Sequence, residues 1–306
     1  MTPDAVLRNP VGSHVKVGKG LVEGALATAA ATGAEALQVF VGNPRGWALT
    51  AGDPARDEAF RAACADRGTR VWVHAPYLVN LGSPTPATFE RSVASVAHNL
   101  LRATRIGAEG VVVHTGSCVD EGTVVQAMRQ VREGLLPVLD ALPDGGPWLL
   151  LEPTAGQGRS LCASVDDLAG YLDALDHHPR VGICLDTCHV FAAGAPLDEP
   201  GGTTATLDRL VEVAGPGRLR LVHANDSKDP RGSLRDRHEQ IGRGHIGADA
   251  FGELLRHPAS AGVPLVLETP GSGEPGSPCL PLLRQLREAA APETAPQTAP
   301  ETAPVR

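Results

Sequence analysis

Residues 184–194 read CLDTCHVFAAG and place four side chains able to bind a metal within six positions. These are Cys184, Asp186, Cys188 and His189. Thiolate ligands are typical of a structural zinc site, whereas carboxylate and imidazole ligands with an open position favour a site that activates water. The segment is also compatible with the end of a buried strand. The rest of the chain has to decide between these interpretations.

Histidines and carboxylates stand at the ends of five other apolar runs. Six consecutive runs that end in His, Asp or Glu are hard to attribute to chance. Buried charges without a partner are costly, and metal ions would compensate them. The six residues are His74, His114, Glu152, Asp186, His223 and Glu268, and the nearby His189, Asp236 and His238 bring the candidate ligands to nine.

The elements that must position these residues repeat eight times. Most of the apolar runs are hydrophobic almost throughout, as in parallel strands covered on both faces, and Ala-, Leu- and Glu-rich helical stretches separate them. This alternation predicts a single (β/α)₈ TIM barrel with its active site at the C-terminal strand ends. An open doubly wound sheet is the main alternative. The predicted strands are 11–15, 36–40, 70–74, 110–114, 148–152, 181–186, 218–224 and 264–268, and predicted helices include 20–32, 55–67, 86–106, 122–141, 164–175, 204–214 and 248–256.

Nine ligand groups are too many for one ion, because a catalytic zinc takes about three protein ligands and a water molecule. Two or three ions are implied, and mixed His and carboxylate ligands suit zinc, with manganese or iron as alternatives. Cys184 lies within a strand and is interpreted as a small core residue. Cys188 has no thiol partner at another strand end. Cys118 comes nearest to being one. We therefore expect Asp186 and His189 to be ligands and both cysteines to be structural.

The chain has 306 residues and a net charge of −8, which argues against a broadly basic surface. Its N-terminus lacks the apolar segment of a signal peptide, and no run reaches the ~18 apolar residues of a membrane span. Its six cysteines show no framework spacing, so we expect reduced thiols and a cytoplasmic protein without membrane contact. The ending AAPETAPQTAPETAPVR predicts a disordered tail over 290–306 after a barrel domain over 1–289.

With these residues in view, the chain resembles the endonuclease IV family of apurinic/apyrimidinic endonucleases. The matching stretches run from Gly12 to Pro270, and the long ones are the most specific. They are GSHV, FVGNPRGW, HAPYLVNLGSP, VVVHTGS, LEPTAGQG, CLDTCHVFAAG, HANDSKDPRGSLRDRHEQIGRGHIG and LETP.

The resemblance implies a TIM barrel with three zinc ions that hydrolyses the DNA backbone 5′ to an abasic site. The products would be a 3′-hydroxyl and a 5′-deoxyribose phosphate, and manganese is an alternative at one of the sites. It assigns His74, His114 and Glu152 to one zinc, Glu152, Asp186, His223 and Glu268 to a second, and His189, Asp236 and His238 to a third. Glu152 and Glu268 would be the catalytic carboxylates. The family also implies a monomer.

Family members hold an abasic nucleotide flipped out of duplex DNA, which is easier where stacking is already lost. The matching loops imply that Asn43, Arg45, Tyr77 and Leu78 contact the duplex. Trp47 is equally compatible with ordinary loop packing. A basic cluster in the loop after the seventh strand is interpreted as a patch that faces phosphates, with Arg237 as its DNA-contacting member. The cluster consists of Lys228, Arg231, Arg235, Arg237 and Arg243.

Two departures from the family pattern concern rate and substrate preference. Lys16 replaces the serine of the usual HVS, and Pro153 replaces the asparagine that usually follows Glu152. Proline lacks an N–H, so any hydrogen bond made by that asparagine is lost. A sugar-isomerase-like barrel and an inactive DNA-damage binder are the alternative functions. An isomerase would not need the third ligand set of His189, Asp236 and His238. An inactive DNA-damage binder would not need nine metal ligands.

Overall fold

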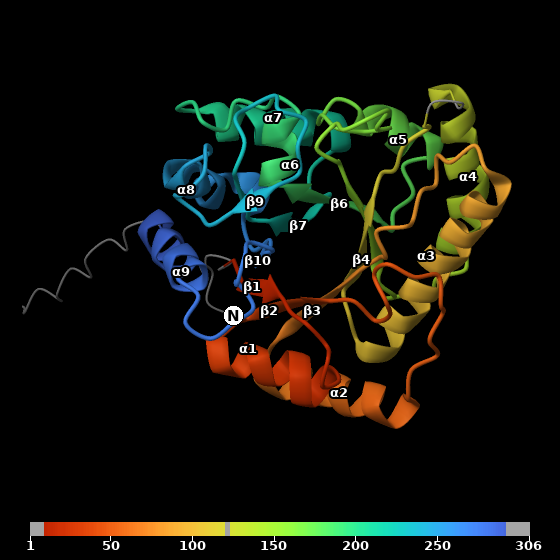
Figure 1. The fold of residues 1–306 in the computed structure, drawn as a ribbon, viewed down its shortest axis with the longest axis horizontal. Coiled ribbons are helices and arrows are strands. Elements are labelled where there is room, and N and C mark those ends of the chain that lie inside the picture. The colour runs from red at the N-terminus through yellow and green to blue at the C-terminus, as the bar shows by residue number, and fades with distance from the viewer. Residues whose placement is uncertain (1–8, 120–122, 292–306) are drawn as a thin grey trace, which may run out of the picture.

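The computed structural model describes residues 9–119 and 123–291. Its parallel strands close into a barrel in the order β1-β10-β7-β6-β5-β4-β3-β2, and helices surround it (Figure 1). The predicted barrel is confirmed and the open sheet is excluded. The strands are β1 (Val11–His14), β2 (Ala36–Val39), β3 (Arg70–His74), β4 (Gly110–His114), β5 (Trp148–Glu152), β6 (Val181–Asp186), β7 (Leu219–His223) and β10 (Leu265–Leu267).

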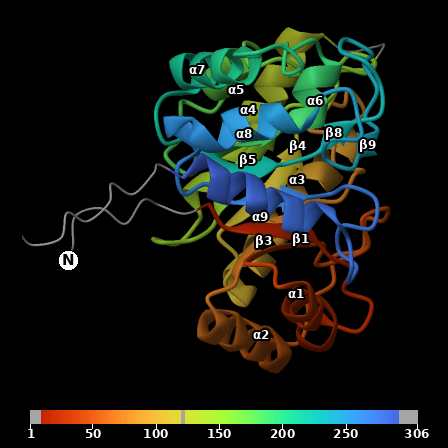
Figure 2. The ribbon, with the colours of Figure 1, turned by 90° about the vertical axis from the view of Figure 1, so that its left-hand side faces the viewer.

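The helices follow the strands along the chain. Figure 2 shows α8 and α9 side by side on the outside of the barrel, with α9 next to β1. The helical elements are a π-helical turn (Leu21–Leu26), α1 (Ala27–Thr32), α2 (Pro54–Arg67), α3 (Pro86–Ile106), α4 (Val124–Asp140), α5 (Leu168–Ala174), α6 (Thr187–Ala192), α7 (Gly202–Ala214), α8 (Ala248–Arg256), a 3₁₀ turn (Pro258–Ser260) and α9 (Cys279–Ala290).

Local signals explain where these helices begin and end. The Asp53 carboxylate accepts hydrogen bonds from the backbone N–H groups of Ala55 and Arg56, and Pro54 occupies the first helical position of α2. The same helix ends at Gly68, whose φ of 65° lies in the left-handed region that glycine adopts without strain. Such ends return the chain to the start of the next strand.

Two helices and one hairpin were not predicted. Helix α6 follows β6 directly, and α9 completes the eighth strand-helix unit. The two-residue strands β8 (Asp226–Ser227) and β9 (His238–Glu239) pair as an antiparallel hairpin in the loop after β7. Of the predicted tail, residues 292–306 lie outside the described residues, and α9 extends to Ala290.

All six cysteines are buried and free of disulfides. Within 9–119 and 123–291, none of the helices combines the length and apolar character that a membrane crossing requires.

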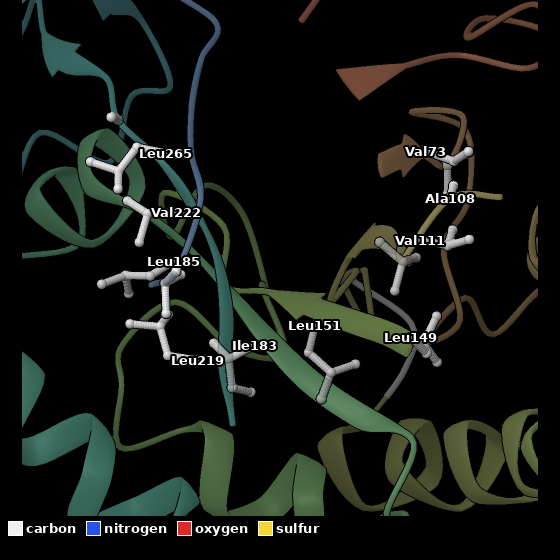
Figure 3. Packing of buried hydrophobic residues seen from close by; sticks show 14 of the residues in the cluster. Val73, Ala108, Val111, Leu149, Leu151, Ile183, Leu185, Leu219, Val222 and Leu265 are labelled. Atoms are coloured by element: carbon white, nitrogen blue, oxygen red, sulfur yellow. The ribbon is translucent and has the colours of Figure 1, made fainter. Parts of the chain in front are cut away.

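Alternation along the strands divides the apolar side chains into two cores. Outward-facing residues such as Val111, Leu149 and Ile183 belong to the large core between strands and helices (Figure 3). The residues between them point inward and fill the barrel with one compact layer. That layer consists of Ala36, Trp72, Val112, Leu150, Cys184, Leu221 and Val266.

Gly12 leaves room for the close approach of β1 and β2. A Cβ atom at Gly12 would lie 1.7 Å from the carbonyl oxygen of Ala36, which is backbone and cannot move aside. We predict that Gly12→Ala lowers the free energy of unfolding by at least about 2 kcal/mol and the melting temperature by about 4–8 °C. Thermal unfolding followed by circular dichroism measures both.

Gly18→Ala is the matched control, because a Cβ atom at Gly18 meets nothing within 4 Å. Its melting temperature should stay within about 1 °C of wild type. Equal melting temperatures for the two variants would contradict this account of the β1–β2 contact.

Candidate metal centre

Polar side chains form the next layer above the apolar interior of the barrel. Because side chains alternate along a strand, the residue two positions after each interior residue also faces inward. In seven strands this residue is polar or charged, and His14 ends the eighth strand, β1. The seven are Gln38, His74, His114, Glu152, Asp186, His223 and Glu268.

Glu152 lies at the centre of this layer and is fully buried. Its Oε2 is 3.3 Å from Nε2 of His74 and 3.3 Å from Nε2 of His114. Its Oε1 is 2.8 Å from Nδ1 of His223. The two oxygens of one carboxylate therefore face two different groups of nitrogen and oxygen atoms.

The second group gathers around His223. Its Nδ1 lies 3.8 Å from Oδ2 of Asp186 and 3.4 Å from Oε2 of Glu268. Candidate ligand atoms of Glu152, Asp186, His223 and Glu268 all lie within 4.8 Å of one another, and so do those of His74, His114 and Glu152.

Helix α6 supplies the first member of a third group. Asp186 ends β6 and also caps α6, because its Oδ1 accepts a hydrogen bond from the backbone N–H of His189 at 3.0 Å. The ring Nδ1–H of His189 donates to the carbonyl oxygen of Pro153 at 3.0 Å, which leaves Nε2 free. That Nε2 lies 3.2 Å from Oδ1 of Asp236.

The loop after β7 supplies the other two members. Nε2 of His238 lies 3.1 Å from the same Oδ1 of Asp236. The hairpin pairs Ser227 with His238, and the buried Asp226 carboxylate accepts backbone hydrogen bonds from the same loop, including one from Ile246 at 2.9 Å. These bonds fix the loop in place over the strand ends.

The donor atoms fit divalent cations. Nε2 of His189 and Nε2 of His238 are buried and have no hydrogen-bond partner within the described part of the chain, although both face a carboxylate oxygen. Such orphaned donor atoms are costly unless another group binds them. Imidazole and carboxylate ligands in these proportions suit zinc.

The pKa shifts show how strongly this cluster demands positive charge. Burial alone would lower the pKa of His189, but the carboxylates of Asp186 and Asp236 outweigh it and raise the pKa to about 10. Burial alone would raise the pKa of Glu152, but the nearby His223 and His114 hold it well below its ordinary value. Without metal the cluster retains protons, which bound cations would displace.

The two cysteines of CLDTCH lie close to the cluster but differ from its other members. Cys184 belongs to the apolar interior layer, and its sulfur lies within 4.8 Å of donor atoms of Glu152 and His223. Cys188 is similarly close to Asp186 and His238. Burial raises the pKa of both thiols to about 12, so they stay protonated and are poor metal ligands. The structure thus brings the nine predicted ligands together, and the oxygen and nitrogen donors are the better ligands.

A cavity of about 360 Å³ opens above the cluster. Tyr77 lines it and is 53% exposed, and the neighbouring Leu78 is 37% exposed. The backbone N–H of Tyr77 donates to the carbonyl oxygen of Pro44 at 3.0 Å and so joins the two predicted DNA-contacting loops. Asn43 accepts a hydrogen bond from the backbone N–H of Arg45, whose side chain is exposed. Of these four residues Tyr77 lines the cavity, and its hydrogen bond to Pro44 brings the loop that carries Asn43 and Arg45 next to it.

The predicted basic patch is largely neutralised by its own neighbours. Arg237 donates to both carboxylate oxygens of Asp229, with 2.6 Å between Nε and Oδ2. Arg231 lies 2.6 Å from Glu199, and the remaining pairs are Lys228 with Glu239 at 3.8 Å and Arg235 with Asp229 at 3.7 Å. Four of the five cations therefore have carboxylate partners, and the patch offers less free charge than its sequence suggests.

Sequence reasoning missed three residues that touch the cluster. His14 lies 3.2 Å from Oε1 of Glu268, and Gln38 contacts both Glu268 and His223. Asn225 donates to Oδ2 of Asp186 at 2.8 Å and accepts from the backbone N–H of Glu268. The inward-facing position at each strand end would have found His14 and Gln38. Asn225 carried no signal of this kind.

The two departures from the family pattern lie in different surroundings. Proline retains its carbonyl group, and the Pro153 carbonyl is the atom that orients His189. Lys16 is exposed in the segment after β1.

Comparisons with known proteins agree with this geometry. A family model described as a xylose isomerase-like TIM barrel matches residues 26–293. A probable endonuclease 4 of Streptomyces coelicolor is 57% identical over 92% of this chain and 96% of its own length. The crystal structure of endonuclease IV from Thermus thermophilus superposes with a TM-score of 0.79 at 35% identity, covering 92% of this chain and 99% of that one. A D-tagatose 3-epimerase-like structure, at 18% identity and a TM-score of 0.68 over 92% of this chain and 96% of that one, shares the fold alone.

Fold and site thus define an enzyme of the xylose isomerase-like TIM barrel class, whose strand ends carry clustered candidate metal ligands. Within this class, the chain belongs to the endonuclease IV family of metal-dependent DNA-repair endonucleases.

Removal of divalent metal should destabilise the protein. Metal that binds only the folded state raises the free energy of unfolding by about 2.7 kcal/mol when the free metal concentration is 100 times the dissociation constant. We predict that chelation lowers the melting temperature by at least about 5 °C and that excess zinc restores it. Differential scanning fluorimetry measures the shift.

His189→Ala should lose part of this zinc-dependent increase. His177→Ala is the control, because His177 is exposed and pairs with Asp173 on α5, away from the cluster. It should keep the whole increase. A melting temperature that zinc does not change in wild type would mean that the cluster holds no metal.

Proposed function

We propose that this chain hydrolyses the phosphodiester bond 5′ to an abasic site in duplex DNA, with three zinc ions bound at the strand ends. The products are a 3′-hydroxyl and a 5′-deoxyribose phosphate. The observation that carries the proposal is that the nine candidate ligands, all buried or half-buried except the more exposed Asp236, include three groups of closely spaced ligand atoms beside one open cavity, and two of these groups share Glu152. Manganese at one position is compatible with the same ligands.

The three groups support three ions. His74, His114 and Glu152 would hold the first, and the third would be held by His189, Asp236 and His238. The second group contains four residues, Glu152, Asp186, His223 and Glu268. When bound, divalent ions promote the ionisation of water, neutralise charge on a phosphate and stabilise a leaving oxygen, which are the needs of phosphodiester hydrolysis.

The protein's own part is to hold these groups in fixed relative positions. Glu152 directs one oxygen to His74 and His114 and the other to His223, so it couples the first two groups. Glu268 directs Oε2 towards His223 and has Oε1 bound by Gln38. Fixed orientation of donor groups lowers the reorganisation that the reaction requires.

Exposed apolar residues near the mouth support a duplex substrate. Tyr77 lines the cavity, and the exposed Leu78 follows it in the same loop. An abasic site in a bound duplex would offer these side chains a gap in the base stack. An apolar side chain can fill such a gap, and flipping a nucleotide without a base costs less stacking energy. A small sugar would need neither these residues nor the third donor group.

Since DNA in the bacterial relatives is cytoplasmic, this substrate also supports a cytoplasmic location.

Glu152→Gln tests the shared carboxylate. An amide offers one acceptor oxygen in place of two, so it cannot serve both donor groups. We predict that incision of a labelled duplex with a single abasic-site analogue slows by at least about 100-fold, while circular dichroism shows an unchanged fold. Gel electrophoresis of the labelled strand gives both the rate and the position of the nick.

Glu109→Gln is the matched control. Glu109 directly precedes β4 at the opposite end of the barrel, where Arg70 binds it at the surface. This variant should incise at the wild-type rate. A wild-type rate for Glu152→Gln, or nicking of undamaged duplex at the same rate, would overturn the proposal.

Leu78→Ala tests the contact with the lesion. We predict that the dissociation constant for an abasic duplex rises about 10-fold, because a small side chain fills the gap in the stack poorly. The constant for undamaged duplex should not change. Fluorescence anisotropy at a fixed salt concentration measures both, since salt alone alters DNA affinity.

Leu101→Ala is the control for Leu78→Ala. Leu101 is a similarly exposed leucine, at 49%, on α3 outside the barrel. Equal affinities of the two variants for the abasic duplex would exclude Leu78 from the interface.

A further inference from the structure

Gln38 is the one inward-facing amide in the polar layer at the described strand ends. It lies in β2, two positions after the interior residue Ala36, and its side chain is fully buried. Its register partner on β1 is His14. Burying an amide is costly unless its donors and acceptor are satisfied, so its hydrogen bonds indicate its role.

The amide of Gln38 joins two residues of the second donor group. Its Nε2 donates to Oε1 of Glu268 at 2.6 Å, and its Oε1 accepts from Nε2–H of His223 at 2.8 Å. The same Nε2 lies 3.0 Å from Nδ1 of His14, so both of its hydrogens have a nearby acceptor atom.

Only one orientation of the amide satisfies these contacts. If the amide were turned round, its oxygen would face the Glu268 carboxylate and its N–H groups would face His223 Nε2. An acceptor would then oppose an acceptor at a hydrogen-bonding distance. The carboxylate of Glu268 therefore fixes the amide, and the amide fixes which nitrogen of His223 carries a hydrogen towards it.

These hydrogen bonds determine which atoms of His223 and Glu268 remain free to bind a cation. With Nε2–H bound to Gln38, His223 presents Nδ1 to Oε1 of Glu152 and Oε2 of Glu268. With Oε1 bound to Gln38, Glu268 has Oε2 free on the same side. A nitrogen lone pair that faces carboxylate oxygens is stable when a cation lies between them.

We propose that Gln38 is a positioning residue for the second donor group: it orients His223 and Glu268 together, and thereby strengthens binding of the ion that this group holds. The inference rests on the proposed function, because it requires that ion to bind. Partners that orient metal ligands typically contribute a factor of about 10–100 in metal affinity.

Gln38→Met is the decisive variant, since methionine has nearly the same length and no hydrogen-bonding amide. We expect one zinc ion per chain to be lost at a chelator concentration about 10- to 100-fold lower than in wild type. The other ions should be lost at the wild-type concentration. Competition with a chromogenic chelator, with zinc counted by atomic absorption, measures this without any DNA substrate.

The melting temperature separates positioning from a merely structural role. A positioning role reduces the increase in melting temperature that zinc produces, whatever the substitution does to the metal-free protein. A purely structural role lowers the metal-free melting temperature and leaves the zinc-dependent increase as in wild type. Gln38→Asn provides a second variant: it keeps the amide but is one carbon shorter, so it should also lose zinc more readily.

Gln130→Met is the matched control, because Gln130 on α4 donates to the carbonyl oxygen of Ser83 far from the cluster. It should retain zinc as wild type does. Wild-type zinc retention in both Gln38 variants would overturn the positioning role while leaving the proposed function intact. Wild-type protein that binds no zinc would overturn both.

Discussion

The alternation of side chains along the barrel strands is the constraint on which the rest of the structure depends. Each strand directs one set of residues towards the helices and the other into the barrel. One inward layer is apolar, and the next carries the polar side chains. Because the period is two, a shift of register by one residue would move Glu152 and His223 into the apolar contact with the helices. The strand register that packs the core therefore also places the side chains of the site.

Charge balance is the second constraint, and it links stability to function. Glu152 and Asp186 are fully buried, which is costly for carboxylates that lack cationic partners. Histidines supply part of the compensation, and the raised pKa of His189 shows that the protein alone supplies it by retaining protons. Divalent ions would replace several protons with fixed charges. Asp186 also caps α6, so one carboxylate serves both a helix and the cluster.

Sequence patterns predicted the strands well because the two signals used, a nearly continuous apolar run and a polar residue at its end, are both local. Four strands agree to the residue, including the two that end at His114 and Glu152. Helix α6 was missed because its residues are all buried, which leaves no amphipathic period to detect. Gln38 was missed because attention to His, Asp and Glu overlooked an amide at an equivalent inward position. The pairing of Arg237 with Asp229 depends on how a loop folds back, which the order of residues does not reveal.

The family's chemistry is best understood as an addition to a barrel that other enzymes share. An epimerase-like structure with 18% identity has the same fold, so the strands alone do not define a nuclease. The first two donor groups come from strand ends, whereas the third comes from α6 and the loop after β7. That loop depends on the buried Asp226, whose carboxylate binds backbone N–H groups instead of the cluster. The ligands of the third group thus lie beyond the strand ends, although α6 itself is fully buried and joins the large core through Val190 and Phe191. The position of His238 relative to Glu152 is then decided by local hydrogen bonds, which is where differences in substrate between related barrels can arise at little cost in stability.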